Sequence, residues 1–516
     1  MSASARSLVS RRPPSRLRPR RLAVGLALLL PACGQAGDWQ FDPRLLMETT
    51  YTDNVLLQPR GEEGDFVFTI TPGLSVRGIG PRHTTSIDYN LQRLEYLDKS
   101  DLATTNHQMR TNIDALLLPE WVSLRTTSSM TQEQIDNRGL VTRGNRGPDD
   151  NRRDVLTYAF APRVEHTFGS TGKARLEYER STIEQKGGPA AFDSFVVGGN
   201  SDEDRYSIDL SSGEDFGRLP SSVYASSREV RFDNSGNNRI ANAGLRTSYV
   251  VSRKFRVNAV GGVEKNSNST GGRGSRQSGV VWNVGGTWTP SVRTSFDANW
   301  GERVFGKTFN MAFRHQHRRL RVDAAYVEDV RTGSDFQRQR LLVPAFDDAG
   351  NPIIDPITDG QIFVPLESPG FIDDTFVERQ LNINLTYTLR RGTVGFRMYR
   401  SDRDFQSGRI DETVDGLSLD LTRNLSPRLV MTAGGAWHLT QRAADEPLGR
   451  YWAIYPSLRY TLGPHTTLRL QYEHSVNKGA VGSFGGGGVS TGGGFEAPGV
   501  RFYTENAISA GLVFNL

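Results

Sequence analysis

The residues best suited to chemistry in this sequence are scattered. Eight histidines are spread along the chain, and only His315 and His317 stand two residues apart. That spacing would place both imidazoles on one face of a strand, where they could hold a metal ion. Arg314, Arg318 and Arg319 flank the pair, and their positive charge opposes cation binding. We therefore expect a tight turn at 315–317 and no metal site.

A group of carboxylates gives a second candidate. Asp347, Asp348, Asp355 and Asp359 lie close to Asn351 in one long polar link. Oxygen-rich loops can bind calcium. We favour a solvated loop over a calcium site, and a third interpretation is that this loop folds inward and narrows an interior channel.

No catalytic constellation stands out. The sequence lacks a G-x-S-x-G nucleophile elbow, and the glycine-rich run 482–494 lacks the Lys-Ser/Thr ending of a phosphate loop. A serine and a histidine brought together only by folding would not be visible in the sequence. We predict that the protein is not an enzyme and has no catalytic residues, cofactor or metal.

The elements that would position any site are strands. Apolar and polar residues alternate in many runs, for example 66–71, 109–117, 381–389 and 508–516. Alternation places successive side chains on opposite faces of a strand. The runs are about 8–12 residues long, which suits a tilted strand that crosses a bilayer. In outer-membrane barrels the apolar face contacts lipid and the polar face lines the interior.

Short and long links alternate between these runs. The short links are 80–82, 119–120, 169–172, 217–220, 252–254, 290–291, 315–317, 390–392, 426–427 and 463–464. The long polar links are 131–154, 181–205, 265–279, 329–376, 402–415, 440–450 and 476–503. This pattern predicts an all-β fold, a single transmembrane antiparallel up-and-down β-barrel in the bacterial outer membrane. We expect about 22 strands, within a range of 16 to 22, with short periplasmic turns and long extracellular loops.

Composition agrees with this fold. Hydrophobic residues make up only 36% of the 516 residues, which fits either disorder or strands that each have one wet face. The aromatic content of 9% argues against disorder. Trp121, Trp288, Trp300 and Trp452 lie near expected strand ends, as in the aromatic girdles of barrels. The 62 basic and 57 acidic residues nearly balance, so we expect no nucleic-acid partner.

The N-terminus has the pattern of a secretory signal peptide. Seven arginines precede a short apolar run at 22–30, and small residues follow it. Cleavage after Ala36 would divide the chain into a signal peptide, 1–36, and a barrel, 37–516. A second possibility is lipidation at Cys33, which a lipobox-like sequence precedes. Strands are expected within about ten residues of Gly37, so we expect no N-terminal plug domain.

The C-terminus fits a strand that the barrel-assembly machinery recognises. The face formed by Ile508, Ala510, Leu512, Phe514 and Leu516 is apolar, although the chain ends in leucine rather than an aromatic residue. The expected partners are this machinery and outer-membrane lipid.

The polar partners within the strands are candidates to line the lumen. They are Arg175, Glu177, Arg256, Asp297, Arg321, Asp323, Arg397, Arg459 and Arg469. Arginine is in excess, so the lumen could be mildly cationic and favour anionic solutes. Alternatively these side chains form arginine–carboxylate pairs across the wall.

One N-terminal stretch carries a family resemblance. It contains Trp39, the segment 48–55 (ETTYTDNV), the segment 71–82 (TPGLSVRGIGPR), Tyr89 and Tyr96. These roughly 60 residues resemble the uncharacterised outer-membrane proteins associated with PEP-CTERM/exosortase and exopolysaccharide systems. The resemblance implies a barrel and a link to surface polysaccharide export. It brings no catalytic or binding residues.

These observations lead to three functional hypotheses. The first is a porin-like channel or export component that passes polysaccharide or small solutes. The second is an outer-membrane enzyme acting on lipid or polysaccharide, and the third is a structural or adhesive barrel whose loops bind partners.

Overall fold

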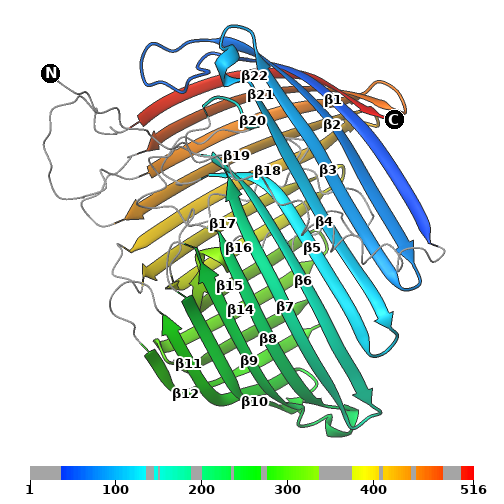
Figure 1. Ribbon diagram of the computed structural model, residues 1–516, viewed down its shortest axis with the longest axis vertical. Helices are drawn as coiled ribbons and strands as arrows, with labels where there is room; N and C mark the ends of the chain where they lie inside the picture. Colours follow the sequence, from blue (N-terminus) through cyan, green and yellow to red (C-terminus); the bar gives the residue numbers. More distant parts are fainter. Residues whose placement is uncertain are drawn as a thin grey trace, which may run out of the picture.

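Each strand of the protein pairs with the strands that precede and follow it in the chain (Figure 1). The computed structural model describes residues 37–134, 144–148, 152–186, 200–233, 237–268, 276–335, 375–405, 411–442, 449–479 and 501–516. The signal-peptide region 1–36, with Cys33, lies outside the described residues, as does the carboxylate group 347–359. Among the described residues, no helix is long and apolar enough to cross a membrane.

The strands of the described residues number 22 and form one sheet. They are β1 (Asp38–Thr52), β2 (Asp65–Gly80), β3 (His83–Tyr96), β4 (Thr104–Leu118), β5 (Val122–Gln134), β6 (Arg152–Phe168), β7 (Gly172–Lys186), β8 (Ser201–Ser212), β9 (Ser221–Phe232), β10 (Asn237–Ser252), β11 (Phe255–Asn268), β12 (Arg276–Ser291), β13 (Thr294–Arg303), β14 (Gly306–His317), β15 (Leu320–Thr332), β16 (Thr375–Leu389), β17 (Gly392–Phe405), β18 (Glu412–Ser426), β19 (Leu429–Arg442), β20 (Gly449–Thr461), β21 (Thr466–Gly479) and β22 (Arg501–Asn515). Two short 3-10 turns, η1 (Ser100–Leu102) and η3 (Glu214–Phe216), lie in the links.

The sheet closes on itself. β1 pairs with β22 in antiparallel register, from Arg44 opposite Asn515 to Thr52 opposite Ala507. We call this β1–β22 pairing the seam. Closure leaves the sheet without a free edge. The predicted antiparallel barrel of about 22 strands is therefore confirmed.

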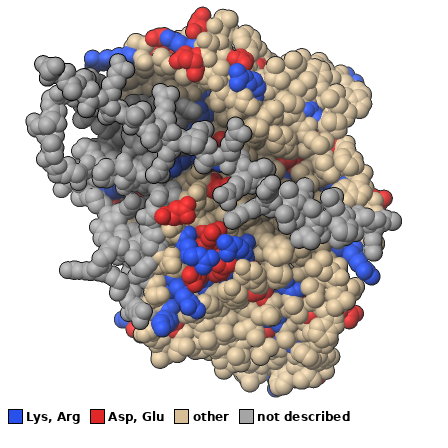
Figure 2. Space-filling model, in the orientation of Figure 1, with Lys and Arg blue, Asp and Glu red and all other residues tan. Residues whose placement is uncertain are grey.

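Alternation along the strands separates an outer face from an inner face. In β2, Phe66, Phe68 and Ile70 are exposed, whereas Val67 and Thr69 between them are buried. The same outer face of other strands carries exposed apolar side chains at mid-strand, namely Leu176, Ile208, Leu245, Val284, Leu419, Leu470 and Ile508. Figure 2 shows broad uncharged areas on the viewed surface, with charged side chains confined to a few patches. Such a surface suits lipid, which solvates apolar side chains.

Aromatic rings mark both ends of the outer face. Near the short turns, Trp39 stacks on His83 with ring centroids 5.6 Å apart. Trp121 stacks on His166 at 3.8 Å. Near the opposite rim, Trp300 meets another indole ring edge-on at 5.0 Å. Rings with one polar edge favour the headgroup level of a bilayer.

The turns match the sequence analysis with two corrections. The turn expected at 315–317 lies at Arg318 and Arg319, because β14 continues through both histidines. Cross-strand bonding extends the strand, since His315 Nδ1 lies 2.9 Å from Thr294 Oγ1 of β13. The histidines face outward, where His315 stacks on Phe313 and His317 stacks on His315. The second correction concerns the turn expected at 290–291, which follows Ser291 instead, because Ser291 still pairs with Thr294.

Three links on the loop side were not identified from the sequence: 97–103, 233–236 and 304–305. The β13–β14 link has only two residues, Val304 and Phe305. A link this short carries no composition signal, because it is no more polar than the strands it joins.

The two faces can be tested on neighbouring residues of β8. Ile208 faces outward at mid-strand and Ser207 faces inward. We expect Ile208→Arg to lower the free energy of unfolding by about 2–4 kcal/mol, because a guanidinium at mid-bilayer lacks water. Ser207→Arg should change it far less, because Glu177 faces it across the ladder. Urea unfolding in phospholipid vesicles measures both, and equal losses would contradict the assignment of faces.

Candidate functional site

The lumen wall is built from the inward-facing residues of the strands. All nine residues proposed from the sequence lie on this face by register. Two of them, Arg175 and Glu177 of β7, form ion pairs with the inward face of β6. Arg175 Nε lies 2.7 Å from Glu165 Oε2, and Glu177 Oε2 lies 2.7 Å from Arg163 Nη2. Cross-strand partners of opposite charge thus neutralise this part of the wall.

The same pairing recurs further along the sheet. Arg321 Nε lies 2.6 Å from Asp323 Oδ2, and Arg314 of β14 lies 2.9 Å from the other oxygen. Asp297 accepts a hydrogen bond of 2.6 Å from the Thr287 hydroxyl. Carboxylates in this region are satisfied by neighbours on the same strand and on adjacent strands.

Three further predicted arginines lie on the inner face: Arg256 of β11, Arg459 of β20 and Arg469 of β21. Arg459 of β20 stands directly opposite Arg469 of β21. Arg469 is buried and donates a hydrogen bond of 2.5 Å to Gln471. In the described part of the chain, neither Arg256 nor Arg459 has a carboxylate within ion-pair distance. Arginine–carboxylate pairing is present at β6–β7 and at β14–β15.

Five alternating charges cross adjacent strands β15 to β19, and we call them the charge ladder. They are Arg331, Glu378, Arg403, Glu412 and Arg442. Successive members lie 2.9, 3.6, 3.4 and 3.8 Å apart. The three central side chains are fully buried. Charges withdrawn from water need such partners, because an unpaired buried charge is strongly destabilising.

Sequence reasoning missed the charge ladder for a definable reason. Arg331, Arg403, Glu412 and Arg442 fall in links predicted at 329–376, 402–415 and 440–450, whereas the strands extend into those links. Beyond the lipid the outward side chains are no longer apolar, so hydropathy alternation ends before the strand does. Alternating charge sign on matched strand ends is the signal that could have revealed it.

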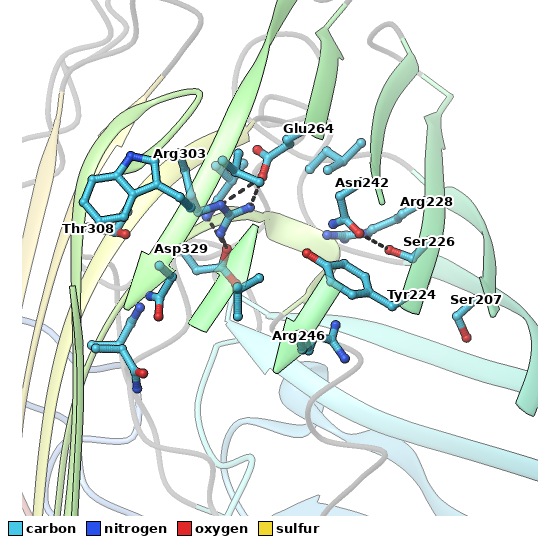
Figure 3. A pocket seen from close by; sticks show the side chains of 18 of the residues that line it. Ser207, Tyr224, Ser226, Arg228, Asn242, Arg246, Glu264, Arg303, Thr308 and Asp329 are labelled. Atoms are coloured by element: carbon cyan, nitrogen blue, oxygen red, sulfur yellow. Dashed lines mark hydrogen bonds and ion pairs between the residues drawn. The ribbon is translucent and has the colours of Figure 1, made fainter. Parts of the chain in front are cut away.

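A cavity of about 740 Å³ opens on the inner wall between β7 and β15 (Figure 3). Four acidic and four basic side chains line it: Glu177, Glu179, Glu264, Asp329, Arg205, Arg228, Arg246 and Arg303. Their charges balance. Uncharged polar groups, including Tyr224, Ser226, Asn242, Asn283, Asn299 and Asn310, occupy much of the remaining wall.

The cavity's arginines are held by carboxylates. Arg303 lies between Glu264, at 2.8 Å, and Asp329, at 2.6 Å, as the dashed lines in Figure 3 show. Arg228 Nη2 lies 2.7 Å from Asp335 Oδ1. These contacts fix the guanidinium groups against the wall and cancel much of their field.

The uncharged groups are fixed in the same way. The Ser226 hydroxyl donates to Asn242 Oδ1 at 2.7 Å, and the Arg246 guanidinium lies 3.8 Å above the ring of Tyr224. Such a wall can exchange hydrogen bonds with a polar solute without imposing a strong charge preference. Among the described residues, no group of three or more His, Cys, Asp or Glu could hold a metal ion.

Comparison with known proteins gives one similarity that bears on the fold. No family model and no curated protein matches the sequence. Among solved structures, the chain is similar to the FrpB iron transporter from Neisseria meningitidis (F5-1 variant), with a TM-score of 0.51 and 9% identity over 93% of this chain and 83% of that chain. The siderophore receptor PirA from Pseudomonas aeruginosa gives a TM-score of 0.44 at 9% identity over 93% and 81% of the two chains. The ferric-catecholate import receptor Fiu from E. coli gives 0.47 at 10% identity over 92% and 82%.

At this identity the similarity establishes the fold alone. The closed sheet, its apolar outer face and its polar inner face agree with that likeness. The protein is an outer-membrane β-barrel.

The charge ladder predicts a difference between two arginines of β17. Arg403→Met would leave Glu378 paired with Arg331 and Glu412 paired with Arg442, and we expect a loss of about 3 kcal/mol in the free energy of unfolding. Arg397→Met, on the same face, removes only a hydrogen bond of 3.2 Å to Asn384 and should cost under about 1 kcal/mol. Urea titrations of both variants in vesicles measure the difference. Equal losses would show that the ladder is not specially stabilising.

Proposed function

We propose that the protein is a porin-like channel for polar solutes and the outer-membrane component of a surface polysaccharide export system. The observation that carries this proposal is the cavity on the inner wall, about 740 Å³ in volume, with balanced charges and many amide and hydroxyl groups. Hydrated solutes rich in hydroxyl groups match that chemistry.

The electrostatics favour uncharged cargo. Because Arg228 and Arg303 are already paired with carboxylates, an anion entering the cavity would have to compete with them. A neutral polyol can replace water at Asn242 and its neighbours without breaking an ion pair. The exchange of one set of hydrogen bonds for another has little net free energy, which suits passage rather than capture.

The link to polysaccharide export rests on the resemblance in residues 39–96 to proteins associated with PEP-CTERM/exosortase systems. Saccharide chains carry many hydroxyl groups and fit the same lumen chemistry. Gene neighbourhood would test this part of the proposal independently of any conductance.

Two partners follow from the outer face. Lipid would contact the apolar mid-strand side chains such as Ile208 and Leu419. The barrel-assembly machinery would recognise β22, whose outward side chains include Ile508, Leu512 and Phe514. Deleting β22 should abolish outer-membrane insertion, since the seam could not form.

Ion selectivity in planar bilayers tests the channel. The purified barrel should conduct with nearly equal permeability to K⁺ and Cl⁻, because the four acidic and four basic side chains of the cavity balance. Arg228→Gln combined with Arg303→Gln should shift selectivity toward K⁺ by about twofold or more, because the carboxylates beside them lose their counter-charges.

The matched control removes two arginines from the outer face of the neighbouring strands, Arg180 of β7 and Arg231 of β9. Arg180→Gln with Arg231→Gln should leave selectivity unchanged. A folded barrel with no conductance would contradict the proposed channel function and favour a structural or adhesive role. Current block by a ferric siderophore, with no block by oligosaccharides, would instead favour iron transport.

A further inference from the structure

Residues 144–148, in the link between β5 and β6, lie against the inner wall, and we call them the lumen segment. The residues on both sides of Arg146 are held by β3. The Asn145 amide donates to Gln92 Oε1 at 2.8 Å, and the Gly147 backbone N–H donates to the Tyr96 hydroxyl at 3.0 Å. Both β3 residues are on the inward face of that strand.

The centre of the lumen segment is held by strands from the other end of the chain. Arg146 Nη2 lies 3.0 Å from Glu473 Oε2 of β21 and 3.9 Å from Glu505 Oε1 of β22. All three side chains are at most 9% exposed. Burial alone would lower the pKa of Arg146, but the charges of Glu473 and Glu505 raise that pKa above its ordinary value. The guanidinium therefore stays charged and bound.

These contacts straddle the seam. β3 lies two strands from β1 on the N-terminal side, whereas β21 and β22 lie on the C-terminal side. The lumen segment thus spans five neighbouring strands along the inside of the wall, from β3 through β2, β1 and β22 to β21. Its backbone and the Arg146 side chain occupy space that the lumen would otherwise contain.

The backbone of the lumen segment is shaped for this position. Gly144, Asn145 and Gly147 all have positive φ, at 67°, 61° and 76°. A Cβ on Gly147 would lie 3.0 Å from the Val55 carbonyl oxygen in the β1–β2 link. Asparagine adopts this left-handed conformation more readily than most non-glycine residues, and the hydrogen bond to Gln92 fixes it against the wall.

We propose that the lumen segment is a latch that narrows the channel, fastened by Arg146 to Glu473 and Glu505, and that release of Arg146 widens the lumen. This proposal depends on the proposed channel function only where conductance is measured. A guanidinium withdrawn part-way would leave both carboxylates without a counter-charge in a dry site, although Glu505 keeps its hydrogen bond from Thr52, so intermediate positions are disfavoured. Two discrete states of the lumen follow, and the charge contact sets their ratio.

Arg146→Gln tests the latch with two readouts. Single-channel conductance should rise. The second readout is labelling of Ser475→Cys, an inward and fully buried residue of β21, by a polar thiol reagent. Its rate should rise about tenfold or more, because a buried charged contact biases a two-state equilibrium by at least that factor. Arg442→Gln, at the end of the charge ladder, is the matched control for loss of an inner-wall arginine and should leave the labelling rate unchanged.

Heat-modifiable gel mobility verifies folding in each variant. If Arg146→Gln does not fold, Glu473→Gln with Glu505→Gln removes the same attraction without leaving a bare buried charge. Exchange of the charges, Arg146→Glu with Glu473→Arg, should restore slow labelling relative to Arg146→Glu alone.

The outcomes separate the latch from the channel. Faster labelling without any conductance supports the latch and overturns the proposed channel. Unchanged labelling in folded variants overturns the latch, whatever the conductance.

Discussion

The need to satisfy every backbone hydrogen bond within lipid governs this structure. Hydrocarbon offers no partner for a free N–H or C=O group, so a spanning sheet must close. The β1–β22 seam meets that requirement and joins residues more than 450 positions apart in the chain, as the Thr52–Glu505 hydrogen bond illustrates. Closure in turn makes each strand two-faced, with one face toward lipid and the other toward an enclosed space.

Two-faced strands explain why charge is distributed as it is. Outward residues at mid-strand must be apolar, so charged side chains are restricted to the lumen and to the strand ends. On the inner wall several of them are buried, and unpaired buried charges would be costly. The charge ladder and the Arg303 contacts are the result. The pairing of these buried charges is thus a consequence of folding stability.

The sequence predicts this fold well where lipid acts on it. Alternation in 381–389 and 508–516 identified β16 and β22, because lipid demands apolar residues at every second position. It failed where lipid no longer acts. Arg403 and Glu412 lie where their strands continue beyond the lipid into water, and hydropathy alternation does not identify strands there. His315 and His317 were assigned to a turn because a polar run at the end of a strand has the composition of a turn. They belong to β14, whose outward rings lie at the headgroup level. The contact of Arg146 with Glu473 depends on register across the seam, which no local pattern encodes.

The latch lies across the seam, where β1 has fewer backbone pairs than it has with β2. Nine residues of β1 pair across the seam, whereas all 15 residues of β1 pair with β2. Side chains supplement the shorter ladder at its extracellular end, where the Asp53 carboxylate accepts hydrogen bonds from the backbone and amide of Asn506. A segment that grips β3 on one side and β21 and β22 on the other adds a third connection. Because the same contact narrows the lumen, releasing it would loosen the seam while widening the channel, so that full opening and maximal stability of the barrel oppose each other.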